Sequence, residues 1–457
     1  MPDYEELIAC QRQFFASQRT KNLDFRIQEL KRLKNVLEQN ETYLYQEIYK
    51  DFKKSDHETY LTELSLLSKE ISLAISKTKR WAQKRKVSTS IVNWPSKGYI
   101  LPEPLGISLI IGAWNYPYQL SLAPAIAAIA AGCTIILKPS EIAPHSSAAM
   151  AKLINENFDP AYFHVVEGGV EETTSLLKVK FDKIFFTGSV SVGKIIHKAA
   201  AEHLTPTTLE LGGKSPAIIM GDADIKITAK RLVWAKFLNA GQTCIAPDYV
   251  MLHSSCKSEF LTELKAQIEK ANYDVSNKNY TQIVNDKNFD RLQKLIDPEK
   301  ICYGGKTDAA TRVIHPTILT QVTFEDAVMQ EEIFGPILPI ISFDDLSNTI
   351  QQINQLPKPL SCYIFTKSKD IRKRILSEIS FGGGTINDAV MHVSEEHLPF
   401  GGVGQSGFGN YHGKAGFETF SHFKSILQKS FLLELDLKYP PYSSSKMKWL
   451  KRLMKFY

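Results

Sequence analysis

The sequence predicts an α/β protein made of two successive units, each built on a parallel β-sheet. Three observations support this prediction. Short apolar runs alternate with helical stretches from residue 105 to about residue 410, which is the rhythm of repeated strand–helix–strand units. Residues 104–137 include no charged side chain, as expected of strands and a helix that are covered on both faces. The chain has 457 residues, enough for two or three domains with large cores.

Residues 3–86 are predicted to be helical. Apolar side chains recur at spacings of three to five residues with Lys, Arg and Glu between them, as on amphipathic helices. The recurring positions include Phe25, Leu30, Leu33, Val36, Leu37 and Leu44. From residue 87 to residue 101 the pattern changes to β-branched and aromatic side chains, which favours an extended arm. The first ten residues carry acids and no apolar run, so no signal peptide is expected.

The strands of the two units are expected at the apolar runs. In the first unit these runs lie at residues 105–111, 134–137, 163–166, 183–186 and 207–211, with helices expected at 143–157 and 190–202. The second unit is expected to cover about residues 212–410, with strands at 217–220, 249–252, 337–341 and 361–365. We find no internal repeat and no flexible linker, so the two units are expected to interleave.

The composition excludes several classes of protein. Six cysteines in an otherwise ordinary composition exclude a disulfide-rich secreted scaffold and a low-complexity disordered chain. The two closest, Cys244 and Cys256, are twelve residues apart, so no zinc knuckle and no metal site is predicted. Scattered cysteines suit a reducing cytosol, so a cytoplasmic location is expected. The uncharged stretch 104–137 is long enough to span a bilayer, but glycines and prolines interrupt it, which favours buried strands and a helix.

The net charge of +6 is concentrated at the C-terminus. Residues 446–457 contain five Lys or Arg and no acid, which leaves 50 basic against 49 acidic residues elsewhere and argues against a nucleic-acid groove. At about 100° per residue, four basic side chains fall on one arc of a helix and the apolar side chains on the rest, and only Lys446 lies on the apolar side. This pattern is typical of an amphipathic helix at a membrane surface; a disordered basic end or a helix docked on a partner subunit also fits it.

Two glycine-rich stretches imitate nucleotide-binding motifs. Residues 402–407 match G-x-G-x-x-G, but no strand precedes them and no helix follows, so the context of a dinucleotide fingerprint is missing. Residues 188–194 come close to a P-loop, but Ile195 stands where a magnesium-binding Ser or Thr is needed, which disfavours kinase or ATPase chemistry. The strand-to-helix turn at residues 187–189 still suits a phosphate at a helix N-terminus. A plain turn capped by Ser189 is the alternative.

Three polar side chains are candidates for catalysis. Cys244 lies in a loop bounded by glycine and proline rather than in an apolar strand, so it is either a nucleophile or a structural thiol. Glu210 lies between two leucines at a strand end, where burial would raise its pKa toward that of a general base; a surface carboxylate is the alternative. Asn115 follows the first strand of the sheet, where its amide could donate to an oxyanion or only form a turn.

Together these segments resemble the NAD(P)-dependent aldehyde dehydrogenases. The matching motifs occur in the order of that family over about residues 100–425. They are Trp114-Asn-Tyr-Pro, Lys138-Pro-Ser-Glu, Phe186-Thr-Gly-Ser, Leu209-Glu-Leu-Gly-Gly-Lys, Gly241-Gln-Thr-Cys, Glu331-Glu-Ile-Phe-Gly-Pro and Pro399-Phe-Gly-Gly. Within the family the chain resembles the class 3 branch, through its short N-terminus, the Cys-Ile-Ala-Pro-Asp-Tyr run from Cys244 and Asn410-Tyr-His-Gly-Lys.

The resemblance implies a domain organisation. A Rossmann-like NAD-binding domain is expected from residues 1–86 and 100–209, and a catalytic domain from residues 210–425. A small β arm for oligomerisation is expected from residues 87–99 and 426–437, followed by the basic tail at 438–457. We expect a homodimer joined through the arm, and contact of the tail with the inner face of a membrane.

The resemblance also implies a mechanism. Cys244 would attack the aldehyde as a thiolate, and Asn115 with the backbone N–H of Cys244 would stabilise the oxyanion. Hydride transfer would leave a thioester, which a water activated by Glu210 would hydrolyse to a carboxylic acid. An acylating reductase would pass the thioester to coenzyme A or phosphate instead; such relatives generally lack the glutamate base. A catalytically silent relative is the other alternative, which the three intact residues disfavour.

Cofactor and substrate residues are implied in the same way. Lys138 and Glu141 would hold the adenine ribose, and Glu332 and Phe334 the nicotinamide ribose. The other cofactor-binding positions are Thr187, Gly188, Ser189 and Gly193 at the pyrophosphate, and Leu211. A carboxylate at Glu141 would accept 2′-hydroxyl donors and repel a 2′-phosphate, so NAD is favoured and NADP remains possible.

The substrate implied by the resemblance is a medium- to long-chain aliphatic or aromatic aldehyde. The pocket that binds it is expected to include Tyr116, Asn387 and His392.

Overall fold

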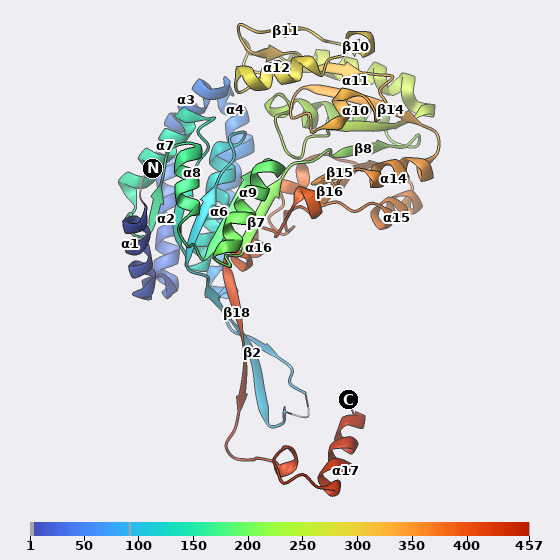
Figure 1. The fold of residues 1–457 in the computed structure, drawn as a ribbon. Helices are drawn as coiled ribbons and strands as arrows, with labels where there is room; N and C mark the ends of the chain where they lie inside the picture. Colours follow the sequence, from blue (N-terminus) through green and yellow to red (C-terminus); the bar gives the residue numbers. More distant parts are fainter. Residues whose placement is uncertain (1–3, 91–92, 457) are drawn as a thin grey trace.

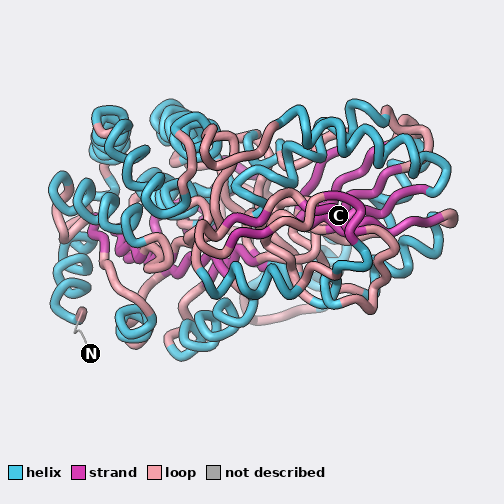
Figure 2. The backbone as a smooth tube through the Cα atoms, turned by 90° about the horizontal axis from the view of Figure 1, so that it is seen from above, coloured by secondary structure: helices cyan, strands magenta, loops and turns pink. Residues whose placement is uncertain are grey.

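The computed structural model describes residues 4–90 and 93–456 of the chain. Two largely parallel sheets, one of six strands and one of seven, lie side by side (Figure 1). Seen from above, helices lie on both sides of the strands (Figure 2). A long three-stranded arm extends away from the sheets, and the C-terminal helix lies near its far end (Figure 1). The predicted α/β class with two parallel sheets is confirmed.

The N-terminal helices form as predicted as far as Trp81, but the expected bound at residue 86 is wrong, because a strand begins at Arg85. They are α1 (Glu5–Ala16), α2 (Leu23–Gln39), α3 (Glu41–Phe52), α4 (Asp56–Thr59) and α5 (Ser65–Trp81), with a π-helical turn at Tyr60–Leu64 before α5. The side chain of Asn22 accepts hydrogen bonds from the backbone N–H groups of Asp24 and Phe25, which caps the start of α2. Leu30 and Leu33 of the apolar stripe are fully buried, so the stripe faces the core.

The first sheet has the strand order β17-β7-β6-β3-β4-β5. Its strands are β3 (Ile107–Ile111), β4 (Thr134–Lys138), β5 (Phe163–Val165), β6 (Lys183–Gly188), β7 (Thr207–Leu211) and β17 (Gly407–Phe408); all but β17 are parallel. Its helices are α6 (Pro117–Ala131), α7 (Pro144–Asn157), α8 (Val170–Leu177) and α9 (Val190–Glu202).

The uncharged stretch forms β3, α6 and β4, all of which are buried throughout. It is therefore core, as the glycines and prolines within it indicate. Within the residues that the structure describes, every helix is too short or too polar to cross a membrane.

The second sheet has the strand order β10-β13-β14-β9-β8-β15-β16. Its strands are β8 (Pro216–Ile219), β9 (Tyr249–His253), β10 (Ile301–Tyr303), β13 (Thr317–Leu319), β14 (Ile337–Phe343), β15 (Ser361–Phe365) and β16 (Gly383–Ile386). Its helices are α10 (Ile225–Phe237), α11 (Lys257–Ala271), α12 (Asp286–Lys294), α13 (Ala327–Gln330), α14 (Leu346–Gln355) and α15 (Lys369–Glu378). A separate ribbon joins β11 (Thr307–Asp308) to β12 (Val313–Ile314). The four strands predicted for this unit all form.

After the second sheet, the chain returns to the first. β17 pairs antiparallel with β7, which puts Gly407 opposite Glu210, and α16 (Gly413–Thr419) packs against α6. Residues 407–419, which the sequence places with the second unit, therefore lie with the first sheet. The boundary predicted at residue 210 falls inside β7. Residues 404–406 form a single 3₁₀ turn, so the G-x-G-x-x-G match opens no α-helix.

The arm consists of β1 (Arg85–Val87), β2 (Ser96–Pro104) and β18 (Ser421–Lys429). β18 pairs antiparallel with β2 from Ser421 opposite Pro104 to Lys429 opposite Ser96. The predicted strand at 426–437 is wrong in its bounds, because β18 begins at residue 421 and ends at residue 429. It ends there because β2 provides no partner beyond Ser96. Residues 91–92 of the predicted arm and residue 457 of the predicted tail lie outside the described residues.

The C-terminal segment forms the predicted helix, α17 (Ser444–Leu453). The Ser443 side chain caps it by accepting the backbone N–H of Lys446 at 3.2 Å. The Lys446 ammonium group donates to the carbonyl oxygens of Tyr439 and Pro441, which ties the helix to the preceding turn. Trp449 is 57% exposed, so the apolar side of the helix is uncovered within this chain.

Replacing Gly407 with alanine is expected to lower the melting temperature by several degrees more than replacing Gly404 with alanine. Both glycines have positive φ, where a Cβ atom strains the backbone by about 1–2 kcal/mol. Only at Gly407 would the Cβ atom also meet backbone, 1.9 Å from the carbonyl oxygen of Leu209. At Gly404 the nearest atom is a lysine side-chain carbon at 3.6 Å. Thermal unfolding followed by circular dichroism measures both shifts, and equal shifts would contradict the expectation.

Candidate functional site

Several predicted residues meet at one edge of the first sheet. Asn115 follows β3, Lys138 ends β4, Thr187 and Gly188 end β6, and Glu210 lies near the end of β7. Because these four strands are parallel, their carboxyl ends share one edge, where open α/β sheets bind their ligands. This edge forms one wall of the site.

The loop that precedes β9 carries Cys244. Asn239 and Ala240 both have positive φ, at +51° and +52°, a conformation that is strained for residues with a Cβ atom. Gly241 follows at φ +72°, and a Cβ atom there would lie 2.3 Å from the carbonyl oxygen of Gly335. Three successive left-handed residues therefore turn the chain sharply just before the cysteine. The side chain of Cys244 is partly exposed.

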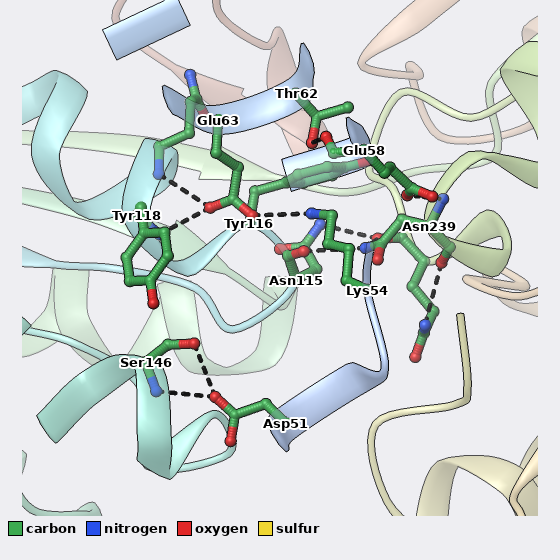
Figure 3. Close-up of polar contacts among 12 residues, drawn as sticks. Asp51, Lys54, Glu58, Thr62, Glu63, Asn115, Tyr116, Tyr118, Ser146 and Asn239 are labelled. Carbon is green, nitrogen blue, oxygen red and sulfur yellow. Dashed lines mark hydrogen bonds and ion pairs between the residues drawn. The ribbon is translucent and has the colours of Figure 1, made fainter. Parts of the chain in front are cut away.

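Hydrogen bonds join this loop to the end of β3 (Figure 3). Nδ2 of Asn115 donates to the carbonyl oxygen of Gln242 at 3.0 Å, and Nδ2 of Asn239 donates to the carbonyl oxygen of Asn115 at 2.9 Å. The hydroxyl oxygens of Tyr116 and Thr243 are 2.6 Å apart. The amide of Asn115 and the ring of Tyr116 are thus held against the residues that lead to the cysteine.

Burial sets the ionisation of the site. Burial raises the pKa of the Cys244 thiol to about 12, and the nearby carboxylates of Glu332 and Glu210 add to this shift. Burial also raises the pKa of Glu210 well above its usual range, and both of its carboxyl oxygens lack a hydrogen-bond partner among the described residues. Burial and the charge of Asp248 raise the pKa of Glu332 to about 8. The thiol of Cys244 and the carboxyl group of Glu332 are therefore mainly protonated at neutral pH in this structure, and burial shifts the pKa of Glu210 in the same direction.

The residues predicted to bind a dinucleotide line the same edge. The ammonium nitrogen of Lys138 is buried, lies 3.5 Å from a carboxylate oxygen of Glu141 and has its pKa lowered by burial. The hydroxyl of Thr187 is buried without a hydrogen-bond partner in the described residues, so it is available to a ligand. The side chain of Ser189 caps α9 by accepting a backbone N–H. The helix cap by Ser189 is therefore present. The other backbone N–H groups in the first turn of α9 can still bind an anion.

Two glycines allow close packing beside these residues. In the first turn of α9, a Cβ atom on Gly193 would lie 2.8 Å from the side chain of Leu211. A Cβ atom on Gly212 would lie 1.9 Å from Oε2 of Glu332. The loop before β14, which carries Glu332, therefore touches the end of β7.

A polar network holds that loop in place. Nζ of Lys214 donates to Oδ2 of Asp248 at 2.5 Å, and Oδ1 of Asp248 accepts the backbone N–H of Ile333 at 2.9 Å. The guanidinium of Arg291 donates to the carbonyl oxygen of Ile333 at 2.6 Å. Phe334 has a φ of +51°, and its ring lies edge-on to that of Trp114. This brings the phenylalanine beside the Asn115 segment.

Two of the predicted pocket residues, Asn387 and His392, lie toward opposite edges of the second sheet. Asn387 follows β16 at the carboxyl edge of the second sheet, whereas Cys244 precedes β9 at the amino edge. Its side-chain oxygen accepts the backbone N–H of Thr366 at 2.8 Å, so Asn387 holds the turn that follows β15. His392 does lie toward the amino edge, 3.2 Å from the hydroxyl of Ser361, and burial lowers its pKa to about 4. It is a neutral, largely enclosed ring.

Some residues of the site escape sequence reasoning. Asn239 lies close to Cys244 in the chain, and its position beside the Gly-Gln-Thr-Cys motif could have drawn attention to it. Glu58 and Glu63 come from the N-terminal helices and Lys54 from the connection between α3 and α4, and all three reach the loops of the site (Figure 3). Charged residues on an amphipathic helix look like a solvent-facing surface, so no pattern in the sequence marks these three.

A sequence model of the aldehyde dehydrogenase family matches residues 2–426. The chain belongs to the aldehyde dehydrogenase family. It is 45% identical over 447 residues to the 4,4′-diaponeurosporen-aldehyde dehydrogenase of Staphylococcus aureus, covering 97% of each chain. It is 44% identical to aldehyde dehydrogenase family 3 member A2 of Pongo abelii, covering 96% of this chain and 92% of the relative. A rat enzyme named dimeric, NADP-preferring aldehyde dehydrogenase is 43% identical over 98% of this chain and 99% of its own.

Among solved structures, the substrate-bound state of Staphylococcus aureus AldH matches this aldehyde dehydrogenase with a TM-score of 0.97 and 44% identity, over 99% of this chain and 100% of that one. The fold, the class 3 resemblance and the NAD(P)-dependent oxidation of aldehydes are thereby confirmed. No three His, Cys, Asp or Glu side chains in residues 4–90 and 93–456 cluster as a metal site would require.

Replacing Glu332 with glutamine is expected to speed the alkylation of Cys244 above about pH 8. Glu332 loses its proton near that pH, and its negative charge then opposes formation of the thiolate. Without that charge the pKa of Cys244 falls, so more thiolate is present at each pH. The rate is measured with iodoacetamide and peptide mass spectrometry across a pH series.

The matched control for this experiment is Glu331→Gln. The carboxylate of Glu331 is 56% exposed and 3.0 Å from the guanidinium of Arg291, so its removal should leave the rate unchanged. Equal acceleration in both variants would mean that overall charge, rather than the position of Glu332, governs the thiol.

Proposed function

We propose that this aldehyde dehydrogenase acts through Cys244, with Asn115 and Glu210 as its catalytic partners. The observation that carries the proposal is the 3.0 Å hydrogen bond from the Asn115 amide to the carbonyl oxygen of Gln242, which holds that amide beside the cysteine loop. An amide nitrogen carries two hydrogens, and the one not used in this bond can donate to an oxyanion formed on Cys244.

In the proposed reaction, Sγ of Cys244 loses its proton to water and bonds to the aldehyde carbon, whose oxygen becomes an oxyanion. The Asn115 amide and the backbone N–H of Cys244 donate to that oxygen. The dinucleotide, when bound, provides the acceptor for the hydride that leaves this carbon, so that a thioester remains on Cys244. Glu210 takes a proton from a water that attacks the thioester, which releases the acid and the thiol. Overall, aldehyde, NAD(P)⁺ and water become carboxylic acid, NAD(P)H and a proton.

The residues along the first sheet fit a dinucleotide. The buried ammonium of Lys138 and the unpartnered hydroxyl of Thr187 suit ribose or phosphate oxygens, and the first turn of α9 suits an anion. The Glu141 carboxylate next to Lys138 would accept ribose hydroxyls and repel a 2′-phosphate, so we favour NAD over NADP. The NADP preference in the name of the rat relative makes both dinucleotides worth assaying.

We further propose medium- to long-chain aliphatic or aromatic aldehydes as substrates. The aromatic ring of Tyr116, held on Thr243 beside the cysteine, supports an apolar substrate. The Staphylococcus aureus relative is named for 4,4′-diaponeurosporen-aldehyde. The buried Glu210, close enough to raise the pKa of Cys244, favours hydrolysis of the thioester over transfer to coenzyme A or phosphate.

Purified protein is expected to reduce NAD⁺ with a series of aldehydes, and Cys244→Ala is expected to abolish this activity. Glu210→Gln should lower the steady-state rate about 100-fold or more while one NADH per site still forms rapidly, because the thioester accumulates. Stopped-flow absorbance measures NADH, and mass spectrometry of the intact protein detects the acyl group. Turnover that requires coenzyme A or phosphate would favour the acylating reductase, and no NADH or NADPH under any condition would favour the silent relative.

The arm and tail support an assembly proposal. We infer a homodimer joined through the arm, because its edge strands β1 and β18 expose apolar side chains such as Val87 and Leu427, and Phe431 and Leu432 follow uncovered. We also infer a cytoplasmic enzyme whose α17 touches the inner face of a membrane, since Trp449 is exposed on a helix rich in lysine.

The intact protein is expected to co-sediment with anionic vesicles at low salt, and a deletion ending at Tyr442 should not. Apolar burial and attraction between the basic tail and anionic headgroups both contribute to the binding, so raising the salt should weaken it. Vesicles of phosphatidylcholine alone serve as the control for charge. Failure of the intact protein to co-sediment, or equal binding of the deletion variant, would contradict the membrane proposal.

A further inference from the structure

Two carboxylates from one short helical segment reach both sides of the proposed catalytic centre. The segment is α4 with the π-helical turn that follows it, residues 56–64, and the carboxylates are those of Glu58 and Glu63 (Figure 3). Neither residue belongs to either sheet, and neither is assigned a role by the family motifs in this sequence.

Glu63 caps the helix that follows Asn115. Its Oε2 accepts the backbone N–H of Tyr118 at 2.8 Å and that of Gln119 at 3.3 Å, both in the first turn of α6. Its Oε1 accepts Nζ of Lys54 at 2.8 Å, and both charged side chains are fully buried. The carboxylate therefore determines where α6 starts and hence where Asn115, two residues before that helix, can lie.

Lys54 also contacts Tyr116, the residue after Asn115. Its ammonium nitrogen lies 4.2 Å from the centre of the Tyr116 ring, a favourable cation–π arrangement. The Tyr116 hydroxyl is bonded in turn to the hydroxyl of Thr243, the residue before Cys244. The buried ion pair is thus linked through one ring to the cysteine loop.

Glu58 binds the loop that leads to Cys244. Its Oε1 accepts the backbone N–H of Asn239 at 2.7 Å, at the first of the three residues with positive φ. The side chain of Asn239 bonds to the carbonyl oxygens of Asn115 and Gln242. One helical segment, residues 56–64, therefore anchors both the segment that carries the Asn115 amide and the loop that carries Cys244.

We propose that Glu63 and Lys54 are positioning residues that hold the Asn115 amide at the oxyanion of Cys244. This inference rests on the proposed catalytic roles of Asn115 and Cys244. A buried ion pair stabilises a fold little compared with apolar residues of similar volume, because both charges lose their hydration. A carboxylate that bonds at once to two N–H groups and an ammonium restricts all three to one geometry, which suits a site where a displacement of about 1 Å lowers the rate about 100-fold.

A matched control lies nearby in the sequence and in the structure. Asp51 also caps a helix, since its Oδ2 accepts the backbone N–H of Ser146 at 2.8 Å and its hydroxyl at 2.7 Å in the first turn of α7 (Figure 3). None of the proposed catalytic residues adjoins α7. Asp51→Asn therefore measures the effect of weakening a buried helix cap, and Glu63→Gln measures that effect together with any loss of positioning.

The test is a double-mutant cycle between Glu63→Gln and Asn115→Ala, with Asp51→Asn carried through the same cycle. Two rates are measured well below the melting temperature of each variant: NAD-dependent oxidation of an aldehyde, and hydrolysis of p-nitrophenyl acetate without dinucleotide. Ester hydrolysis also forms an oxyanion on the cysteine but needs no dinucleotide, so it reports on Asn115 even if no aldehyde is turned over.

We expect Glu63→Gln to lower kcat for both reactions about 10-fold or more and to leave the KM for NAD within about twofold. In the Asn115→Ala background the same change should lower kcat less than about twofold, because the group that Glu63 positions is gone. Asp51→Asn should leave kcat unchanged in both backgrounds.

If Glu63→Gln lowers kcat by the same factor in the Asn115→Ala background as in the wild-type background, the proposal is overturned. An equal decrease of kcat in Asp51→Asn would also overturn it. If Glu63→Gln does not fold, Lys54→Met combined with Glu63→Gln removes both buried charges and takes its place in the cycle. If the wild-type protein hydrolyses the ester but oxidises no aldehyde, the proposed function fails while the ester cycle still decides the positioning role.

Discussion

The hydrogen bonds between Asn115 and the loop at residues 239–243 hold the two sheets together at the point where chemistry is proposed. One partner follows a strand of the first sheet, and the other precedes a strand of the second. One buried apolar cluster includes residues of both sheets, such as Phe185 of the first and Val250 of the second, but apolar packing has no direction and does not by itself set the distance between an amide on one sheet and a thiol on the other. Hydrogen bonds that cross between the units can set that distance. The loop that makes them has a strained backbone at Asn239 and Ala240.

The electrostatics of the site follow from the same burial. Burial raises the pKa values of the thiol and of the two nearby acids, Glu210 and Glu332, so the charged form of each is disfavoured there. An interior that disfavours charge suits the apolar aldehydes that are proposed as substrates. In the proposed reaction, the oxyanion would form where the Asn115 amide and the backbone N–H of Cys244 can donate to it.

The parts of the structure that depend on local pattern are predictable from the sequence. Apolar runs mark the strands of both sheets, and the motifs mark Cys244, Glu210 and Asn115 before any coordinates are known. Long-range strand pairing is harder to predict. β18 ends at Lys429 because its partner strand β2 begins only at Ser96, although apolar residues continue after Lys429. Asn387 lies in a motif-rich segment, and only the direction of β16 shows that it is at the carboxyl edge of the second sheet. The buried pair of Lys54 and Glu63 is least predictable, since a charge gives no sign in sequence of being inside.

The return of the chain to the first sheet constrains how the two units can move. The chain leaves the first sheet after β7 and comes back at β17, and these two strands are paired, with Gly407 opposite Glu210. Both connections between the units therefore run side by side. A single connection would allow the units to swivel freely, whereas two adjacent ones act as a hinge with one axis. Glu210 lies beside both connections, so a change in the angle between the two units would displace it less than residues farther from them.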